Sequence, residues 1–294
     1  MSTIDYRGLA ALDAIIGTGS FERAALALSI SQPAVSHRLR ALEESAGALL
    51  VIRSHPPQAT EQGQRLIAHY RQVRLLEASL RPGPGAPAEL PQLGIAVNAD
   101  SAATWFPEAL APLLTPPSCL IDIRIDDQEH TLRHLCEGRV VACVTSAREV
   151  IAGADMTPLG IMRYHCVAAP SFARHWMPQG LSVEAVSRAP ALIYNKSDAL
   201  HDSFLRQQLG WKGGYPHHTF ATSEGFVRFI EAGHAYGMVP ALQARASLAS
   251  GALCELVPGV SFDVPLAWYC WSIQTALTRN LTASVVETAA RWLV

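Results

Sequence analysis

Hydrogen-bonding and cationic side chains are concentrated in one short stretch near the N-terminus. Amide, hydroxyl, imidazole and guanidinium groups bind base edges and phosphates when the helix that carries them lies in the major groove of DNA. The same side chains are also typical of the solvated face of an ordinary surface helix, and spacing alone does not separate the two interpretations. The residues concerned are Gln32, Pro33, Ser36, His37, Arg38 and Arg40, and proline is acceptable in the first turn of a helix.

The flanking sequence predicts two short helices joined by a tight turn. Ser20 can cap the first helix, whose apolar residues recur at three- and four-residue spacing. Val35, Leu39 and Leu42 form the inner face of the second helix. The stretch from Ser20 to Glu44 is therefore typical of a helix-turn-helix, except that Ser29 stands where such turns often carry glycine. The apolar residues of the first helix are Phe21, Ala24, Ala25 and Leu28.

A preceding helix and a following hairpin complete this unit. Residues 4–17 have the apolar spacing of a helix, and 49–53 have strand character. After a turn, Thr60 is suited to cap a new helix. A strand, turn and strand beside a helix-turn-helix form a wing, and Arg53 would then face the phosphate backbone or the minor groove, unless it is merely a surface charge. The sequence thus predicts an all-α winged helix-turn-helix over residues 1–60.

A long helix and a linker follow this unit. Apolar residues recur at seven-residue spacing, which predicts a linker and dimerisation helix over residues 61–81, although a helix packed only on its own domain has a similar pattern. A run rich in proline and glycine then predicts a hinge over 82–90. The heptad positions are Leu66, Val73 and Leu80, with His69 and Leu76 between them.

Strands alternate with helices from residue 91 onwards, which indicates an α/β fold with a parallel sheet. The predicted strands are too many for one small sheet covered by short helices, so we expect two α/β lobes. The chain is expected to cross between the lobes near residues 162 and 265. This division assigns the first lobe to 91–162 and 265–294, and the second lobe to 163–264.

Polar side chains follow the first three strands of the predicted first lobe. Ligands of parallel α/β sheets bind beyond the carboxyl ends of the strands, so these side chains are expected to converge. Ser101 and the backbone N–H groups after it could hold an anionic group. The carboxylates favour a cationic ligand, because an unpaired carboxylate in a cleft is costly, although acidic loops are often only solvated. The candidates are Asn98, Asp100, Ser101, Asp126, Asp127, Glu129 and Thr145.

Two residues of the predicted second lobe are further candidates for the ligand site. Tyr194 lies at the end of a strand, and Glu224 lies at the start of a helix. A glutamate at a helix start complements the helix dipole, so Glu224 has an ordinary structural explanation. If it faces the cleft instead, it would complete a site for an amino acid.

Composition narrows the class of protein. The chain has 294 residues and a formal net charge of -2, so any affinity for nucleic acid must come from where the arginines lie. No signal peptide or apolar membrane segment is evident, and we expect a soluble cytoplasmic protein without membrane association. The six cysteines have no zinc-ligand spacing, and no catalytic motif is evident, so neither a metal nor an enzyme is expected.

Several sequence runs carry a family resemblance over nearly the whole chain. FERAA at 21–25 and SQPAVSHRLRALE at 31–43 resemble the DNA-binding helices of LysR-type transcriptional regulators. AVNADSAATW at 96–105 and RIDDQEH at 124–130 resemble the ArgP/LysG subfamily more narrowly. Members of that subfamily respond to lysine or arginine and control the export of basic amino acids.

The resemblance implies a winged helix-turn-helix, a linker helix and an effector domain of two Rossmann-like lobes, similar to type 2 periplasmic binding proteins. It implies promoter DNA, RNA polymerase and further copies of the chain (a dimer or tetramer) as partners. It assigns Gln32, Pro33, Ser36, His37, Arg38 and Arg53 to DNA contact, and L-lysine or L-arginine as effector, with no cofactor. It places the effector near the Ser101 loop, the 126–129 turn, Thr145 and the Glu224 loop.

Two other hypotheses remain at this stage. A LysR-type regulator can instead respond to an aromatic or organic acid or to a redox signal, in which case Cys136 and Cys143 would be a candidate pair. An α/β enzyme with an accessory N-terminal domain is the third hypothesis, and the lack of a nucleophile with a matching base argues against it.

Overall fold

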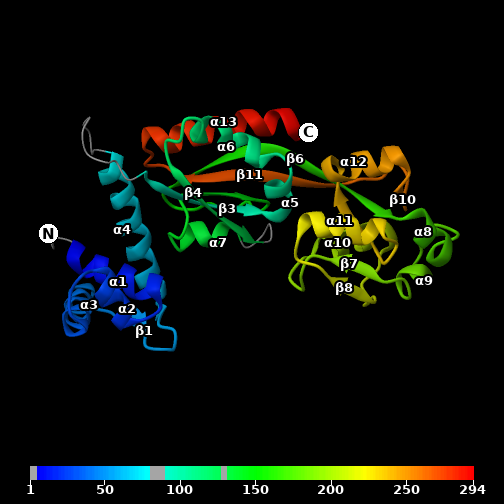
Figure 1. Cartoon of the computed structure of the whole chain (residues 1–294). Coiled ribbons are helices and arrows are strands. Elements are labelled where there is room, and N and C mark those ends of the chain that lie inside the picture. Colours follow the sequence, from blue (N-terminus) through cyan, green and yellow to red (C-terminus); the bar gives the residue numbers. More distant parts are fainter. Residues whose placement is uncertain (1–4, 80–89, 127–130) are drawn as a thin grey trace.

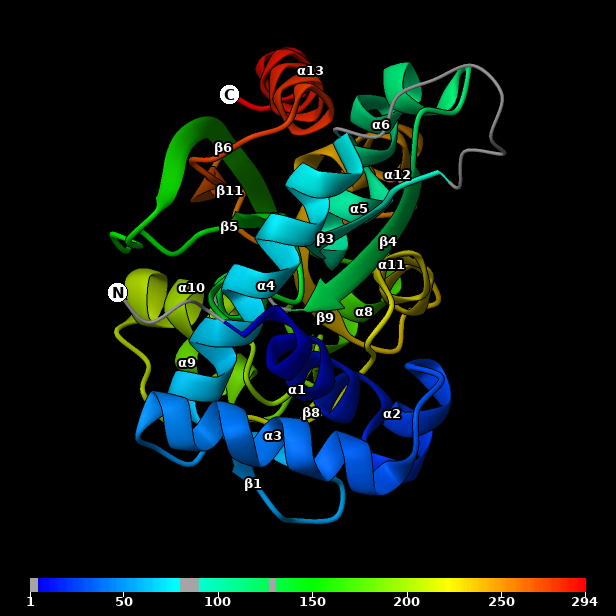
Figure 2. The same cartoon turned by 90° about the vertical axis from the view of Figure 1, so that its left-hand side faces the viewer.

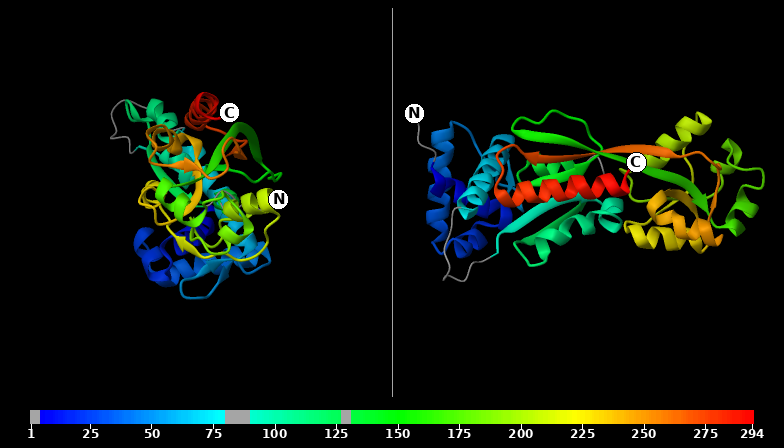
Figure 3. Two further views of the ribbon diagram at one scale, coloured as in Figure 1. Left: turned by 90° about the vertical axis from the view of Figure 1, so that its right-hand side faces the viewer. Right: turned by 90° about the horizontal axis from the view of Figure 1, so that it is seen from above.

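The computed structural model describes residues 5–79, 90–126 and 131–294. A helical N-terminal domain lies at one end, and two α/β lobes follow it in a row (Figures 1 and 3). The long helix α4 (Glu61–Ser79) lies between the N-terminal domain and the first lobe. None of the described helices has the length and apolar character needed to cross a membrane.

The N-terminal domain is built on three helices that bury one apolar cluster. They are α1 (Tyr6–Thr18), α2 (Phe21–Ala27) and α3 (Gln32–Ala46), and each begins after a side chain that caps its first turn: Asp5, Ser20 and Ser31. Ser29, in the turn between α2 and α3, has φ 53°, a left-handed conformation that explains the preference for glycine there. The predicted helix-turn-helix therefore has the expected turn geometry.

A short hairpin and α4 complete this domain. Strand β1 (Val51–Ile52) pairs antiparallel with β2 (Gln58–Ala59) to form the predicted wing. On α4, Ile67 and Tyr70 are buried against the N-terminal cluster. The heptad positions that the structure describes are only partly buried in the single chain, whereas Leu80 lies outside the described residues. These partly buried positions are Leu66, His69, Val73 and Leu76.

One nine-stranded sheet runs through both lobes in the order β4-β3-β5-β11-β6-β9-β7-β8, and β10 (Cys254–Glu255) pairs with β6. In the first lobe, β3 (Gln92–Asn98) pairs parallel with β4 (Leu120–Asp126) and with β5 (Ala142–Thr145). In the second lobe, β7 (Ala191–Ile193) pairs parallel with β8 (His217–Thr219) and with β9 (Tyr236–Pro240).

The chain passes between the lobes along β6 (Ala154–Ala168) and β11 (Phe262–Trp271) (Figure 1). These strands are antiparallel to each other and to their neighbours, so the sheet as a whole is mixed. The first three strands of the first lobe, β3, β4 and β5, are parallel as predicted. Strand β6 also begins well before residue 162, because its first half pairs with β11 inside the first lobe.

Helices cover the sheet in both lobes. The first lobe has α5 (Ala99–Ala103), α6 (Phe106–Leu114), α7 (Thr131–Cys136) and α13 (Ala276–Trp292). The second has α8 (Pro170–Trp176), α9 (Val183–Val186), α10 (Leu200–Leu209), α11 (Ser223–Glu231) and α12 (Ala241–Ser250). The sequence did not predict α12, because alanines and serines give it no continuous apolar stripe.

Candidate functional site

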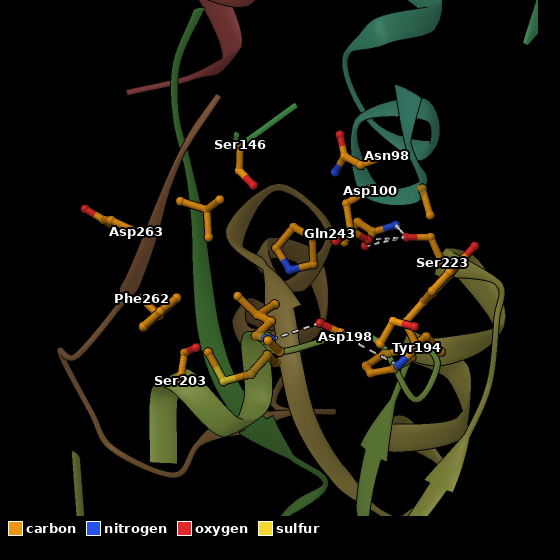
Figure 4. Close-up of a pocket in the computed structure, with 18 of the residues that line it drawn as sticks. Asn98, Asp100, Ser146, Tyr194, Asp198, Ser203, Ser223, Gln243, Phe262 and Asp263 are labelled. Atoms are coloured by element: carbon orange, nitrogen blue, oxygen red, sulfur yellow. Dashed lines mark hydrogen bonds between the residues drawn. The ribbon is translucent and has the colours of Figure 1, made fainter. Parts of the chain in front are cut away.

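A cavity of about 310 Å³ lies between the two lobes. The ends of β3 and β4 line it from the first lobe, and α10, α11 and α12 line it from the second. Residues at the start of β11 line it where the chain passes between the lobes. Figure 4 shows Asn98 and Asp100 approaching from one side and Ser223 and Tyr194 from another.

The cavity wall is acidic. Four aspartates line it, whereas none of its described lining residues is a lysine, arginine or histidine. Asp263 is neutralised by Arg163, whose Nε and Nη2 each donate to it at 2.9 Å. Asp100 instead accepts hydrogen bonds from hydroxyl groups, Asp126 contacts a histidine, and Asp198 accepts hydrogen bonds from backbone N–H groups. The cavity is therefore suited to a cation.

Asp100 connects the two lobes. Tyr164 Oη and Ser223 Oγ each donate to its carboxylate at 2.8 Å, and Ser223 belongs to α11 of the second lobe. The Nε2 of Gln243 on α12 donates to Ser223 Oγ at 2.9 Å (Figure 4). Desolvation by burial raises the pKa of Asp100, and the two donated hydrogen bonds oppose this increase. A cation beside this carboxylate would favour its charged form.

The other two aspartates have different surroundings. Asp126 contacts Nε2 of His134 on α7 at 3.1 Å. Asp198 accepts a hydrogen bond from the backbone N–H of Leu200 at 3.0 Å and a longer one from Tyr194 at 3.4 Å, which fixes the loop before α10 (Figure 4). Asp198 thus stabilises the backbone of the loop that forms part of the cavity wall, whereas Asp126 contacts the side chain of His134.

The structure brings together four of the nine residues predicted for the effector site: Asn98, Asp100, Asp126 and Tyr194 line the cavity. Ser101 and Thr145 do not line it. Both are fully buried, and Thr145 Oγ1 accepts a hydrogen bond from the backbone N–H of Ala147. Glu224 is exposed in the first turn of α11 and also lies outside the cavity lining. Asp127 and Glu129 lie outside the described residues.

Sequence reasoning missed several lining residues. Ser146 and Ser223 line the cavity and directly adjoin the predicted Thr145 and Glu224, which do not line it. Asp198 follows the strand end at Tyr194 and lies just before α10, and an aspartate between a strand and a helix is a signal that sequence analysis could have used. Gln243 was missed together with α12. Phe262 and Asp263 come from the beginning of β11, just before residue 265, near which the chain was expected to cross between the lobes.

One buried lining residue offers polar atoms toward the cavity. Asn98 is 2% exposed, and neither its amide nitrogen nor its oxygen has a hydrogen-bond partner among the described residues. Buried amides are normally paired. Figure 4 shows this side chain at the cavity beside Asp100. A ligand carboxylate is one group that would accept from the amide nitrogen.

The predicted DNA-contacting residues lie on α3 and in the wing. Figure 1 shows α3 at the end of the molecule remote from the lobes, and Figure 2 views the molecule from that end, with α3 lying across the lower part of the view. Gln32, Pro33, His37 and Arg40 are exposed, and so is Arg53 in the wing. Ser36 and Arg38 are half-buried. At the helical angle per residue, Arg38 lies roughly 160° from Ser36 around α3, so these two side chains lie on different sides of the helix.

The cysteines are poorly suited to a redox role. No disulfide is present among the described residues, and Cys143 is fully buried. Burial raises the pKa of both Cys136 and Cys143, which disfavours the reactive thiolate. The described residues also contain no cluster of three or more His, Cys, Asp or Glu side chains that could hold a metal ion.

Family comparisons cover both parts of the molecule. Residues 6–64 match the bacterial regulatory helix-turn-helix proteins of the lysR family, and residues 89–290 match the LysR substrate binding domain. The chain belongs to the LysR family of transcriptional regulators. This LysR-type regulator therefore has the predicted fold class, and its family consists of DNA-binding regulators rather than enzymes.

Individual relatives confirm the resemblance to ArgP and LysG. The HTH-type transcriptional regulator ArgP of Pseudomonas fluorescens strain Pf0-1 is 41% identical over 293 residues, 99% of this chain and 98% of the relative. The crystal structure of ArgP from Mycobacterium tuberculosis has 36% identity and a TM-score of 0.90 over 99% of both chains. Full-length LysG from Corynebacterium glutamicum with bound effector Arg has 34% identity and a TM-score of 0.81, over 98% of this chain and 99% of that chain.

Proposed function

We propose that this LysR-type regulator binds a cationic amino acid, L-lysine or L-arginine, in the cavity between its lobes and changes its action on promoter DNA in response. The observation that carries the proposal is the lining of the cavity, with four aspartates and no described basic residue. Arg163 neutralises one of them, Asp263. The bound effector Arg of C. glutamicum LysG, a relative at 34% identity, supports the same ligand class.

The proposed binding mode assigns one role to each type of lining residue. Asp100 and Asp126 bind the two cationic groups of the ligand, its α-ammonium and its side-chain cation. The amide nitrogen of Asn98 donates to the α-carboxylate. Phe226 and Met238, which line the second-lobe side, contact the aliphatic part of the ligand. Because Asp100 is already bonded to Ser223 across the cleft, a ligand held by Asp100 stabilises the closed arrangement of the lobes.

The DNA-binding half of the proposal rests on the exposed residues of α3 and the wing. Gln32, His37 and Arg40 reach base edges or phosphates in the major groove, and Arg53 contacts the backbone or the minor groove. Two copies related by a two-fold axis would read half-sites about 34 Å apart. The target is a gene for amino-acid export, transcribed by RNA polymerase, and the protein acts in the cytoplasm, where the promoter is.

Isothermal titration calorimetry with matched ligands tests the cavity. L-arginine and L-lysine are expected to bind, whereas L-citrulline, the uncharged isostere of arginine, is expected to bind at least about tenfold more weakly because it cannot pair with a carboxylate. Asp126→Asn should weaken arginine binding. The matched control is Asp122→Asn on the same strand, outside the cavity lining, which should not.

Two outcomes would contradict the assignment. Equal affinities for arginine and citrulline would remove the role of the ligand's side-chain charge. Wild-type affinity for arginine in Asp126→Asn would place the ligand elsewhere. If no amino acid binds, an aromatic acid or an oxidant becomes the next effector to try, although the raised pKa values of Cys136 and Cys143 argue against the redox signal.

A further inference from the structure

The linker helix α4 rests on the turn between α7 and β5. Gly138, in this turn, has φ +64°, and a Cβ on it would lie 2.3 Å from Cα of Ala68 on α4. Real Cβ atoms do not approach a backbone this closely, so the contact requires glycine. The first effector lobe therefore touches the backbone of the helix that leaves the DNA-binding domain.

Arg71 joins three parts of the chain at this contact. From α4, its Nη1 donates to the carbonyl oxygen of Gly138 at 3.0 Å, and its Nε donates to Asp13 on α1 at 2.7 Å. The side chains of Arg71 and Asp13 are only 33% and 27% exposed, so water screens this ion pair less than a surface pair. One guanidinium group thus holds the DNA-binding domain, the linker helix and the effector lobe together.

The same turn is held from the cavity side by His134. The backbone N–H of Arg139 donates to the carbonyl oxygen of His134, and the backbone N–H of Gly138 donates to the carbonyl oxygen of Leu135, each at 2.9 Å. This is the Schellman arrangement that ends a helix on a left-handed glycine. The side chain of His134 contacts Asp126, which lines the cavity, at 3.1 Å. Glu137 is 6% exposed and contacts Arg139 at 2.8 Å, which ties the turn further.

We propose that α7 and the turn after it couple the cavity to the DNA-binding domain within one chain, with His134 as the positioning residue on the cavity side and Arg71 on the DNA side. A ligand cation that binds Asp126 competes with the contact between Asp126 and His134, and so weakens the contact that positions α7. The turn transmits that change to Arg71 and so to Asp13 on α1. The coupling rests on the proposed function in one respect, because it takes Asp126 as a contact of the ligand.

A double-mutant cycle without any effector tests the coupling. The affinity of the full-length protein is measured for a DNA duplex that it selects from a random-sequence library, in the wild type, Asp126→Asn, Arg71→Ala and the double variant. Asp126→Asn is expected to change the Kd for DNA by about threefold or more in the wild-type background, and by less than about 1.5-fold in Arg71→Ala. Asp13→Asn, which removes only the far end of the route, should suppress the effect as well and replaces Arg71→Ala if that variant does not fold.

Arg65→Ala is the matched control, since Arg65 also lies on α4 and pairs with a carboxylate, Glu61, at 2.8 Å, but contacts neither the turn nor α1 through that pair. Asp126→Asn should retain its full effect in this background. The same factor in wild type and Arg71→Ala, or no effect of Asp126→Asn in the wild type, would overturn the coupling. A separate titration with L-arginine distinguishes the two proposals: coupling in the cycle without a response to arginine would refute the effector and leave the route intact.

Discussion

Replacing Gly138 with alanine should destabilise the protein more than the same change at a glycine of equal backbone conformation. Gly210, which ends α10, provides the comparison: its φ is +63° against +64° at Gly138, and a Cβ on it would have no heavy atom within 4 Å. At Gly138 the added Cβ would lie 2.3 Å from Ala68 Cα and 2.6 Å from its Cβ. The two variants therefore share the backbone strain and differ in the steric clash.

The magnitudes follow from these two contributions. A left-handed alanine costs about 1 kcal/mol, so Gly210→Ala should lose about that much free energy of unfolding. Restoring ordinary contact at Gly138 requires α4 and the turn to separate by roughly 1 Å, and overpacking of this kind adds about 1–3 kcal/mol. Urea unfolding of both variants, followed by tryptophan fluorescence, measures the difference. Losses that agree within about 0.5 kcal/mol would refute the close contact between α4 and the turn.

Two further predictions concern single residues. Ser29→Gly should stabilise the helix-turn-helix by up to about 1 kcal/mol, because it removes the strain of a left-handed backbone at an exposed position. Slower hydrogen exchange in α2 and α3 would report this gain. Ser29→Ala, which keeps the Cβ, should give no such gain. Burial lowers the pKa of His201 to about 4, so its contribution to stability is complete above pH about 6.5 and is lost as the pH falls toward 4, when the unfolded chain takes up a proton first. Between pH 7 and pH 5 the wild type should lose about 2 kcal/mol more than His201→Phe, and equal losses in urea unfolding would contradict this.

Local sequence signals predicted the parts of the fold whose determinants are close in the chain. Ser20 caps α2 as predicted, because a hydroxyl side chain just before apolar residues at helical spacing accepts a hydrogen bond from the first turn. The ends of β3 and β4 converge because parallel pairing places Asn98 opposite Asp126, which is a property of strand direction alone. This is why Asn98, Asp100 and Asp126 were placed at one cavity from the sequence.

Features that depend on tertiary packing were not predictable in the same way. Whether Thr145 or its neighbour Ser146 faces the cavity depends on how the chain turns after β5, and strand alternation cannot be extended into a turn. Asp263 lines the cavity but is neutralised by Arg163, a hundred positions earlier in the chain, through the pairing of β6 with β11. The contact of Arg71 with both Asp13 and Gly138 likewise needs three elements to be placed first.

The antiparallel pair of β6 and β11 determines how the lobes can move. Pulling the lobes apart is resisted by the extended backbone of both strands. Shifting one strand along the other would break the backbone hydrogen bonds between them, each of which contributes about 1 kcal/mol. Bending and twisting the two-stranded ribbon break none. Its register shifts at Leu266, opposite Gly160, so the pair already carries an irregularity at which extra twist is accommodated. The lobes therefore move relative to each other by hinge bending, which opens and closes the cavity. An effector favours the closed arrangement when it contacts both lobes at once.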